Sequence, residues 1–302
     1  MYKFNEILQG IKNPRAAGRE INRLVHTRGH TQTYNPAGSG IFSEDWDNLI
    51  ILDACRYDYF DELADLPGTT GYRYSLAPAT YKFIRANFTN KKAHDTVYVS
   101  ANGWFLQLKD EIDAEVYKFI DLLSDETPVE LSGEETEVPS PGAVTNHALG
   151  AFQDYPNKRL IVHYLQPHHP FIGHRGKQYS NLDSSSLIEV VDASNKGDEE
   201  LRYAYRENLE LVLEEVEVLL EQLEGKTVVT ADHGEMLGDR HDYWPSKDYG
   251  HHPGIFNDAT VKVPWHVYEH GERRELVSGA PDPSDPVDAD LDEHLRNLGY
   301  KL

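Results

Sequence analysis

The sequence contains a single cysteine, Cys55, among its 302 residues. One cysteine excludes an intrachain disulfide and a cysteine-based zinc cluster. The chain also lacks any apolar run of the roughly 18 residues that a membrane-spanning helix needs. Its N-terminus lacks the continuous apolar segment of a signal peptide. Together these absences predict a soluble, cytoplasmic protein.

Positive charge is scarce as well. The chain has 29 Lys and Arg against 51 Asp and Glu, which gives a net charge of −22. Such a surface repels nucleic acid, so DNA or RNA binding by the main body is excluded as a function. Self-repulsion of this size is tolerated where salt screens it, which predicts a halophilic protein. The 39% of hydrophobic residues is enough for one globular core.

The first 30 residues depart from this acidic character. They hold six Lys and Arg against two Glu, a local charge of 6 − 2 = +4. Apolar residues fall at helical spacing in two groups: Phe4, Ile7, Leu8 and Ile11, then Ile21, Leu24 and Val25. We therefore predict a basic amphipathic N-terminal arm over residues 1–45, able to make peripheral contact with an anionic membrane. The alternative is a helix packed on its own domain.

Short apolar runs predict strands at residues 48–53, 96–101, 159–165, 226–231 and 261–268. Helical patterns separate them, at residues 114–125, 143–155 and around a repeat that runs from Leu209 to Leu223. Alternation of strands and helices predicts an α/β fold, a doubly wound, mostly parallel sheet with helices on both faces. We expect one domain over residues 46–302, closed by a tail helix.

Polar side chains follow several of these predicted strands. Asp53 closes the first, His168 and His169 follow the third, Asp232 and His233 follow the fourth, and His251 and His252 stand just before the fifth. The carboxyl ends of parallel strands lie at one edge of a sheet, so one cleft could gather all four clusters. Carboxylate and imidazole groups together suit a divalent metal. A hydrogen-bonded Asp-His turn is the alternative for Asp232 and His233 taken alone.

Five segments resemble, in order, the motifs of the alkaline phosphatase superfamily, especially its sulfatase-like branch. They are "NLIILDACRYDYF", "LAPATYKFIRANFT", "HYLQPHHPF", "TADHGEMLGDR" and "GHHPGIFNDATVKVPW". The fourth resembles the family's D-H-G-E signature, which is specific, whereas the second and third are weak when taken singly. The resemblance covers about residues 46–302 and implies an alkaline phosphatase-like fold.

The resemblance also implies roles for individual residues. Asp53, Asp232 and His233 would hold one divalent ion (Zn, Mn, Mg or Ca), and Thr80 would be the nucleophile beside it. The family's formylglycine signal "C/S-x-P-S-R" is absent, because the run here is "TYKFI". The alternative for Thr80 is a helix N-cap. His168 would face the substrate anion or the leaving group, and His251 would be the later metal-binding histidine.

Other positions carry weaker expectations. A one-residue shift would give the role of His251 to His252, and Lys82 either pairs with the substrate anion or is an exposed lysine. Arg56 would either contact the anion or form a buried pair with an acidic residue such as Asp58, which we favour. Gln166 stands where two-metal members have a carboxylate, which argues against a full second metal site.

The function that these residues predict is metal-dependent hydrolysis of sulfate or phosphate esters through a metal-activated threonine. The partner is then an anionic ester. Two alternatives stay open: a transferase that moves a phosphoryl head group from a lipid- or glycan-linked donor, and a degenerate binding protein. The presence of Asp53, Thr80, Asp232 and His233 argues against the second alternative.

Overall fold

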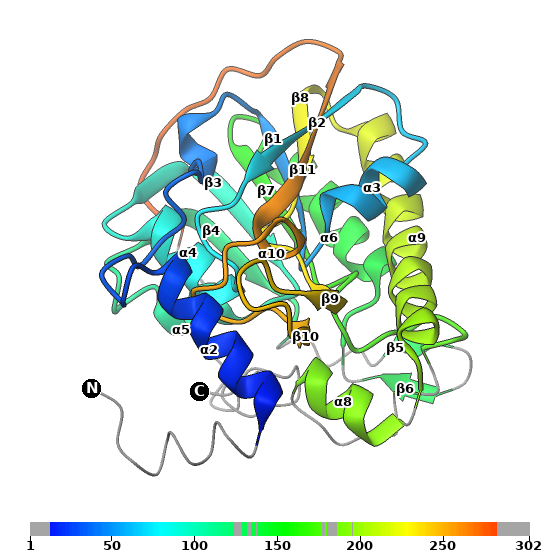
Figure 1. Ribbon diagram of the computed structural model, residues 1–302. Coiled ribbons are helices and arrows are strands. Elements are labelled where there is room, and N and C mark those ends of the chain that lie inside the picture. Colours follow the sequence, from blue (N-terminus) through cyan, green and yellow to red (C-terminus); the bar gives the residue numbers. More distant parts are fainter. Residues whose placement is uncertain are drawn as a thin grey trace.

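A mixed seven-stranded sheet runs through the part of the chain that the structure describes (Figure 1). The structure is a computed structural model and describes residues 13–123, 129–131, 134–136, 138–176, 179, 186–194 and 196–282. The strands, in spatial order, are β2 (Thr69–Tyr74), β11 (Lys262–His270), β8 (Gly225–Thr230), β1 (Asn48–Leu52), β7 (Arg159–Tyr164), β3 (Lys92–Ser100) and β4 (Glu115–Asp121).

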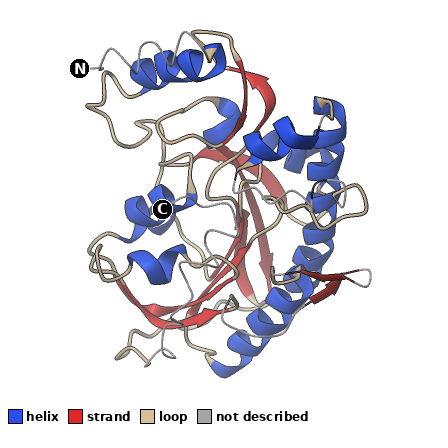
Figure 2. Cartoon of the chain, turned by 90° about the horizontal axis from the view of Figure 1, so that it is seen from below, coloured by secondary structure: helices blue, strands red, loops and turns tan. Residues whose placement is uncertain are grey.

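The direction of the strands confirms the predicted fold class. Neighbouring strands from β8 to β4 are parallel, and β11 runs antiparallel to both β8 and β2. Helices cover both faces of the sheet, with α6 (Pro141–Asp154) and α9 (Asp198–Gln222) on one side and α4 (Thr80–Phe88) and α5 (Trp104–Leu108) on the other (Figures 1 and 2). The fold is a doubly wound α/β sheet.

The described residues also form several smaller elements. They are α2 (Pro14–His26), the 3-10 turn η1 (Ile41–Ser43), α3 (Tyr57–Leu63), the hairpin β5 (Val129–Leu131) and β6 (Glu134–Thr136), α8 (Leu187–Ser194), the hairpin β9 (Met236–Arg240) and β10 (Lys247–Gly250), and α10 (Asp258–Val261).

Burial explains why the central elements form where they do. All five residues of β1 are buried, as expected for a parallel strand covered on both faces. In α9 the buried residues Leu209, Val212, Val216 and Leu219 recur at spacings of three and four, which places them on one face of the helix. Helix α6 begins with Pro141 after the side chain of Ser140 caps its first turn. The predicted helices at residues 143–155 and 209–223 are therefore confirmed.

The helix predicted at residues 114–125 is wrong. Residues 115–121 form strand β4, which pairs in parallel with β3. The segment is rich in β-branched and aromatic residues, and Val116 and Phe119 are buried against the core. Pairing with β3 determines the extended conformation of residues 115–121. The spacing of apolar residues in this segment could not reveal that pairing.

Helix α2 packs on the body of the protein beside the hairpin β9–β10 (Figure 1). Its Arg19 forms two 2.7 Å bonds with the fully buried carboxylate of Asp248. Burial alone would raise the pKa of Asp248, but hydrogen bonds from Arg19 and from two histidines hold that pKa well below its usual range. The alternative of a helix packed on its own domain is thus confirmed for α2.

Some predictions fall outside the described residues. The apolar group from Phe4 to Ile11 and the tail helix beyond residue 282 lie there. The division into an arm at 1–45 and a domain at 46–302 stays a prediction. Among the described residues, no helix is long and apolar enough to cross a membrane.

The pair between Arg19 and Asp248 gives a prediction about stability. Arg19→Met leaves a buried carboxylate without its guanidinium partner, so the free energy of unfolding should fall by about 3 kcal/mol. Urea denaturation at high salt measures it. Arg85→Met is the matched control, because Arg85 forms a similar two-bond pair with the exposed Glu111 and should change little. Equal effects of the two substitutions would contradict the proposed role of burial.

Candidate metal and active site

Two buried carboxylates end neighbouring strands at one edge of the sheet. The register of β1 and β8 pairs Ile51 with Thr230, so Asp53 and Asp232 each lie two residues beyond the same level. Both residues are fully buried, with 0% exposure. The sequence predicts this convergence, and the register explains it, because parallel strands carry their ends to one place.

Hydrogen bonds fix the two carboxylates in place. Asn102 donates from Nδ2 to Asp53 at 2.8 Å. The amides of Ala54 and His233 donate to Oδ1 of Asp232 at 3.1 and 2.8 Å. The pKa of Asp232 is nevertheless raised, chiefly by burial. A positive charge between the two carboxylates would offset that cost.

Three side-chain oxygens lie near one ring nitrogen of His233. Nε2 of His233 lies 3.2 Å from Oγ1 of Thr80, 3.3 Å from Oδ2 of Asp232 and 3.6 Å from Oδ1 of Asp53. A tetrahedral zinc site with ligands at about 2.0–2.1 Å has ligand-to-ligand distances of about 3.3 Å. Nδ1 of His233 donates to the carbonyl of Gly234 at 2.9 Å, which leaves the lone pair of Nε2 facing the oxygens. These residues fit a divalent cation.

Polar atoms without partners support the same fit. In the described part of the chain, Oδ2 of Asp232 and Nε2 of His163 are buried and have no hydrogen-bond partner. Ligand atoms of Asp53, His163 and Asp232 all lie within 4.8 Å of one another. The other ring nitrogen of His163 lies 2.8 Å from the hydroxyl of Tyr98, which orients the ring. His163 is thus a further candidate ligand that the sequence did not reveal.

Thr80 is the first residue of α4 and is buried. The alternative of an N-cap role is wrong, because the N-cap is Ala79 and no side chain caps this helix. The hydroxyl of Thr80 instead faces His233. The first amides of a helix have no intrahelical acceptor, so an anion that approached Thr80 would meet donors of α4.

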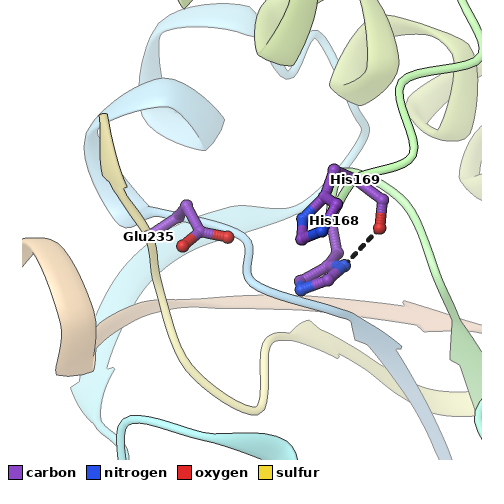
Figure 3. Close-up of side chains that lie close together, drawn as sticks. All are labelled: His168, His169 and Glu235. Atoms are coloured by element: carbon purple, nitrogen blue, oxygen red, sulfur yellow. Dashed lines mark hydrogen bonds between the residues drawn. The ribbon is translucent and has the colours of Figure 1, made fainter. Parts of the chain in front are cut away.

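A second group of ligand side chains lies beside the first. Ligand atoms of His168, His169 and Glu235 lie within 4.8 Å of one another, and the carboxylate of Glu235 faces the two histidines (Figure 3). A ring nitrogen of His168, Nδ1, contacts the carbonyl oxygen of His169 (Figure 3). Sequence reasoning argued against a full second metal site because of Gln166, and this stays a prediction, although Glu235 is a carboxylate in this group of candidate ligands. Gln166 is buried and its Nε2 faces the carbonyl of Pro139 at 3.5 Å.

His251 joins the two groups. Its ring lies 4.2 Å from that of His233 and 5.1 Å from that of His168, between ring centroids. Nδ1 of His251 is 3.1 Å from a carboxylate oxygen of Glu235. Burial lowers the pKa of His251, but Glu235 outweighs it and raises the pKa overall. By contrast, burial holds the pKa of His168 and His233 well below the usual range.

Arg56 is bound within the structure. Its guanidinium forms 2.7 Å contacts with Asp58 and Asp239 and donates to the carbonyl of Glu235 at 3.2 Å. The pair with Asp58 that the sequence favours is therefore present. Contact between Arg56 and substrate stays a prediction.

His252 and Lys82 lie at the margin of the site. Nε2 of His252 lies 2.8 Å from the carbonyl of Tyr249 and 3.6 Å from Asp248, so this ring faces away from the group around Thr80. Lys82 is half-buried, and the pKa of its amine is lowered by burial and by the nearby Arg85 and Arg23. Among the residues that the structure describes, no carboxylate pairs with Lys82.

No protein-family model matches the sequence, and no curated protein matches it. Among solved structures, the chain is similar to the C-terminal periplasmic domain of EcEptC from Escherichia coli in complex with Zn (13% identity, TM-score 0.47, covering 75% of this chain and 74% of that one). It is also similar to a 2-O GAG sulfatase (14% identity, TM-score 0.48, 76% and 65% covered). A third likeness is to the phosphonate monoester hydrolase SpPMH from Silicibacter pomeroyi (14% identity, TM-score 0.43, 83% and 72% covered). The chemistry proposed below rests on the residues of this chain and not on these likenesses.

The ligand assignment predicts the metal content of variants. Asp232→Asn keeps the shape of the side chain but removes its charge, so affinity for a divalent metal should fall more than the about 10–100-fold that loss of an outer hydrogen-bond partner costs. Equilibrium dialysis followed by elemental analysis measures it. Glu235→Gln is the control and should retain at least one bound metal ion. Full metal content in Asp232→Asn would contradict the assignment.

The buried histidines predict a dependence of stability on pH. Burial lowers the pKa of His163 to about 4 and that of His169 to about 3, from 6.5. The unfolded chain therefore binds more protons than the folded chain between those values, so stability should fall as pH drops from 6.5 towards 4. Thermal unfolding with a chelator, in 2 M KCl to screen surface repulsion, is the measurement.

His169→Asn removes one of these two titrating groups and should make the loss of stability in acid smaller. A thermal midpoint that stays constant or rises over the same pH range would show that other groups dominate.

Proposed function

We propose that the protein is a metal-dependent hydrolase of sulfate or phosphate esters and that Thr80 is its nucleophile. The observation that carries the proposal is the buried hydroxyl of Thr80, 3.2 Å from Nε2 of His233 and beside two buried carboxylates. A threonine hydroxyl is a weak nucleophile at its ordinary pKa. A bound divalent cation would favour the deprotonated hydroxyl and neutralise charge on the ester group.

That cation would be held by the side chains of Asp53, Asp232, His233 and Thr80, which would not need a large rearrangement. The amides of the first turn of α4 and the amine of Lys82 lie on the same helix as Thr80. An ester oxygen placed against them would be oriented for attack by the hydroxyl, since helix N-termini and cations both favour anions. Lys82 is therefore assigned to the substrate anion.

The proton for the leaving group is assigned to His251. The sequence favours His168 for this role, but burial keeps its pKa well below the usual range, so His168 is neutral near pH 7. His251 has a raised pKa, and its Nδ1 can donate to Glu235. A histidine whose pKa is raised keeps its proton to higher pH than one whose pKa is lowered, and it is therefore the better general acid. His168 then serves, with His169 and Glu235, as a ligand group.

A transferase would use the same nucleophile and differ only in the acceptor, which would be a hydroxyl group in place of water. The described residues contain no feature that favours one acceptor over the other. Release of inorganic sulfate or phosphate in the absence of any added acceptor separates hydrolysis from transfer.

The role of Thr80 is tested with chromogenic aryl sulfates and aryl phosphate mono- and diesters, in multimolar salt with added divalent metal. Thr80→Ala should lower kcat/KM by more than about 1,000-fold, because removal of a nucleophile removes the covalent route. Thr80→Ser keeps a hydroxyl and should lose far less activity.

The control is Ser75→Ala, which removes another buried hydroxyl near Asp232 but one that donates to backbone oxygens. Ser75→Ala should lower the stability of the fold. It should leave the dependence of turnover on pH largely unchanged. Wild-type turnover by Thr80→Ala would refute the mechanism, and absence of turnover of every ester by the wild-type protein would favour a binding function.

A further inference from the structure

The turn that ends β1 has an unusual backbone conformation. The amide of Cys55 donates to the carbonyl of Leu52 at 3.2 Å, which closes a four-residue turn with Asp53 and Ala54 at its centre. Ala54 has a φ of 60°. In this left-handed region the Cβ of an L-residue lies too close to the following carbonyl oxygen, so turns that need it at their third position usually have Gly or Asn there.

Ala54 differs from the other residues with this conformation. Among the described residues, the other non-glycine residues with a positive φ are Arg28, His30, Asn90 and Asp113. All four are exposed, whereas Ala54 is fully buried. A strained residue persists only where its surroundings hold it, and such residues cluster at functional sites. The conformation of Ala54 therefore requires contacts that keep it in place.

The hydroxyl of Tyr205 bridges the end of this turn. It donates to the carbonyl of Ala54 at 2.8 Å and accepts from the amide of Arg56 at 3.0 Å. Tyr205 lies on α9 and is fully buried, with its ring 5.2 Å from that of Tyr59 between ring centroids. One hydroxyl, from a residue 151 positions away from Ala54, thus holds the peptide groups on both sides of Cys55.

The left-handed turn links the two buried carboxylates of the site. The amide of Ala54 donates to Oδ1 of Asp232 at 3.1 Å, so the residue that follows one carboxylate binds the other. The carbonyl of Asp53 accepts from the amide of His168 at 3.1 Å, which joins the turn to the segment with the two histidines. Loss of the conformation at Ala54 would therefore displace Asp53 from Asp232.

The same face of α9 holds a second segment of the site. Asn208 is also fully buried, and its side chain donates to the carbonyl of His168 at 3.1 Å and accepts from the amide of Ile172 at 2.8 Å. Asn208 is three residues after Tyr205, so the two side chains are neighbours on the helix surface. Helix α9 thus presents two buried polar groups to the segments that carry Asp53 and His168.

We infer that Tyr205 is a positioning residue of the candidate metal site: it holds the left-handed turn at Ala54 and thereby holds Asp53 beside Asp232. The inference rests on the proposed function, because it takes these carboxylates to bind a divalent cation. Tyr205 acts through the backbone and not as a ligand. The alternative is a hydroxyl that only satisfies buried backbone groups and has no effect on metal binding.

Affinity for Zn²⁺ separates these two roles. Tyr205→Phe keeps the ring and its packing but removes the hydroxyl, so the affinity should fall about tenfold, the lower end of what loss of an outer hydrogen-bond partner costs. Equilibrium dialysis of the full-length protein against zinc chloride in multimolar KCl measures it. Tyr164→Phe is the matched control, because its hydroxyl is also buried but lies 2.8 Å from that of Thr145. The control should bind Zn²⁺ like the wild type.

Ala54→Gly tests the role of the backbone. Glycine adopts the left-handed conformation without the cost that a Cβ imposes, so the turn would depend less on the hydroxyl of Tyr205. In the wild-type background Ala54→Gly should change the affinity for Zn²⁺ little. Added to Tyr205→Phe, it should make the loss of affinity smaller, since two substitutions that act on one turn are not additive. Circular dichroism checks that each variant is folded.

Three results would overturn the positioning role alone. They are undiminished Zn²⁺ affinity of Tyr205→Phe, an equal effect of Ala54→Gly in both backgrounds, and failure of the double variant to fold. Absence of Zn²⁺ binding by the wild-type protein would instead overturn the metal site itself, and with it both the positioning role and the proposed function. The two failures are therefore distinguishable, and no measurement requires turnover of an ester.

Discussion

The burial of two carboxylates, Asp53 and Asp232, is the constraint on which the rest of the site depends. Each has lost its water completely, and like charges at the ends of neighbouring strands repel each other. Hydrogen bonds from Asn102 and from the amides of Ala54 and His233 offset part of this cost. The rest of the cost of burying these two negative charges is best offset by a positive charge, since a buried charge is stable only when it is paired. The site is built for a charge that the chain itself does not supply.

The sequence reveals this pair because strand ends are simple to recognise. The run before Asp53 is apolar from Leu49 to Leu52, the run before Asp232 is centred on Val228 and Val229, and the structure buries nearly every residue of both strands. A strand of this kind belongs in the middle of a parallel sheet, and neighbouring parallel strands end together. The histidine clusters are expected from the same rule, whereas Thr80 is expected only from the resemblance of its segment to a family motif. The fold class and the convergence of Asp53 and Asp232 at one edge of the sheet could therefore be predicted, and their role as ligands stays a prediction.

The rest depends on tertiary pairing that local pattern does not contain. His163 sits within an apolar run and looks like a core residue, but the register pairs it with Ile51, on the same face as Asp53 two residues later. Strand β4 takes its conformation from β3, and the edge strand β2 is mostly exposed and lacks a buried alternation. Glu235 acquires its role only when His168 and His169 arrive from another strand. In each case contact with residues far along the chain determines the conformation or the surroundings of the residue.

The hairpin β9–β10 connects the site to helix α2. Glu235 directly precedes β9 and His251 directly follows β10, so the base of the hairpin lies in the site, while its tip carries Tyr243 and Trp244. Strands of this length span about 15 Å at roughly 3.3 Å per residue. Arg19 of α2 binds Asp248 of β10, and Asp248 in turn contacts His252. Helix α2 is therefore tied through a buried ion pair to the strand that directly precedes His251, so the packing of α2 and the geometry of the site are linked.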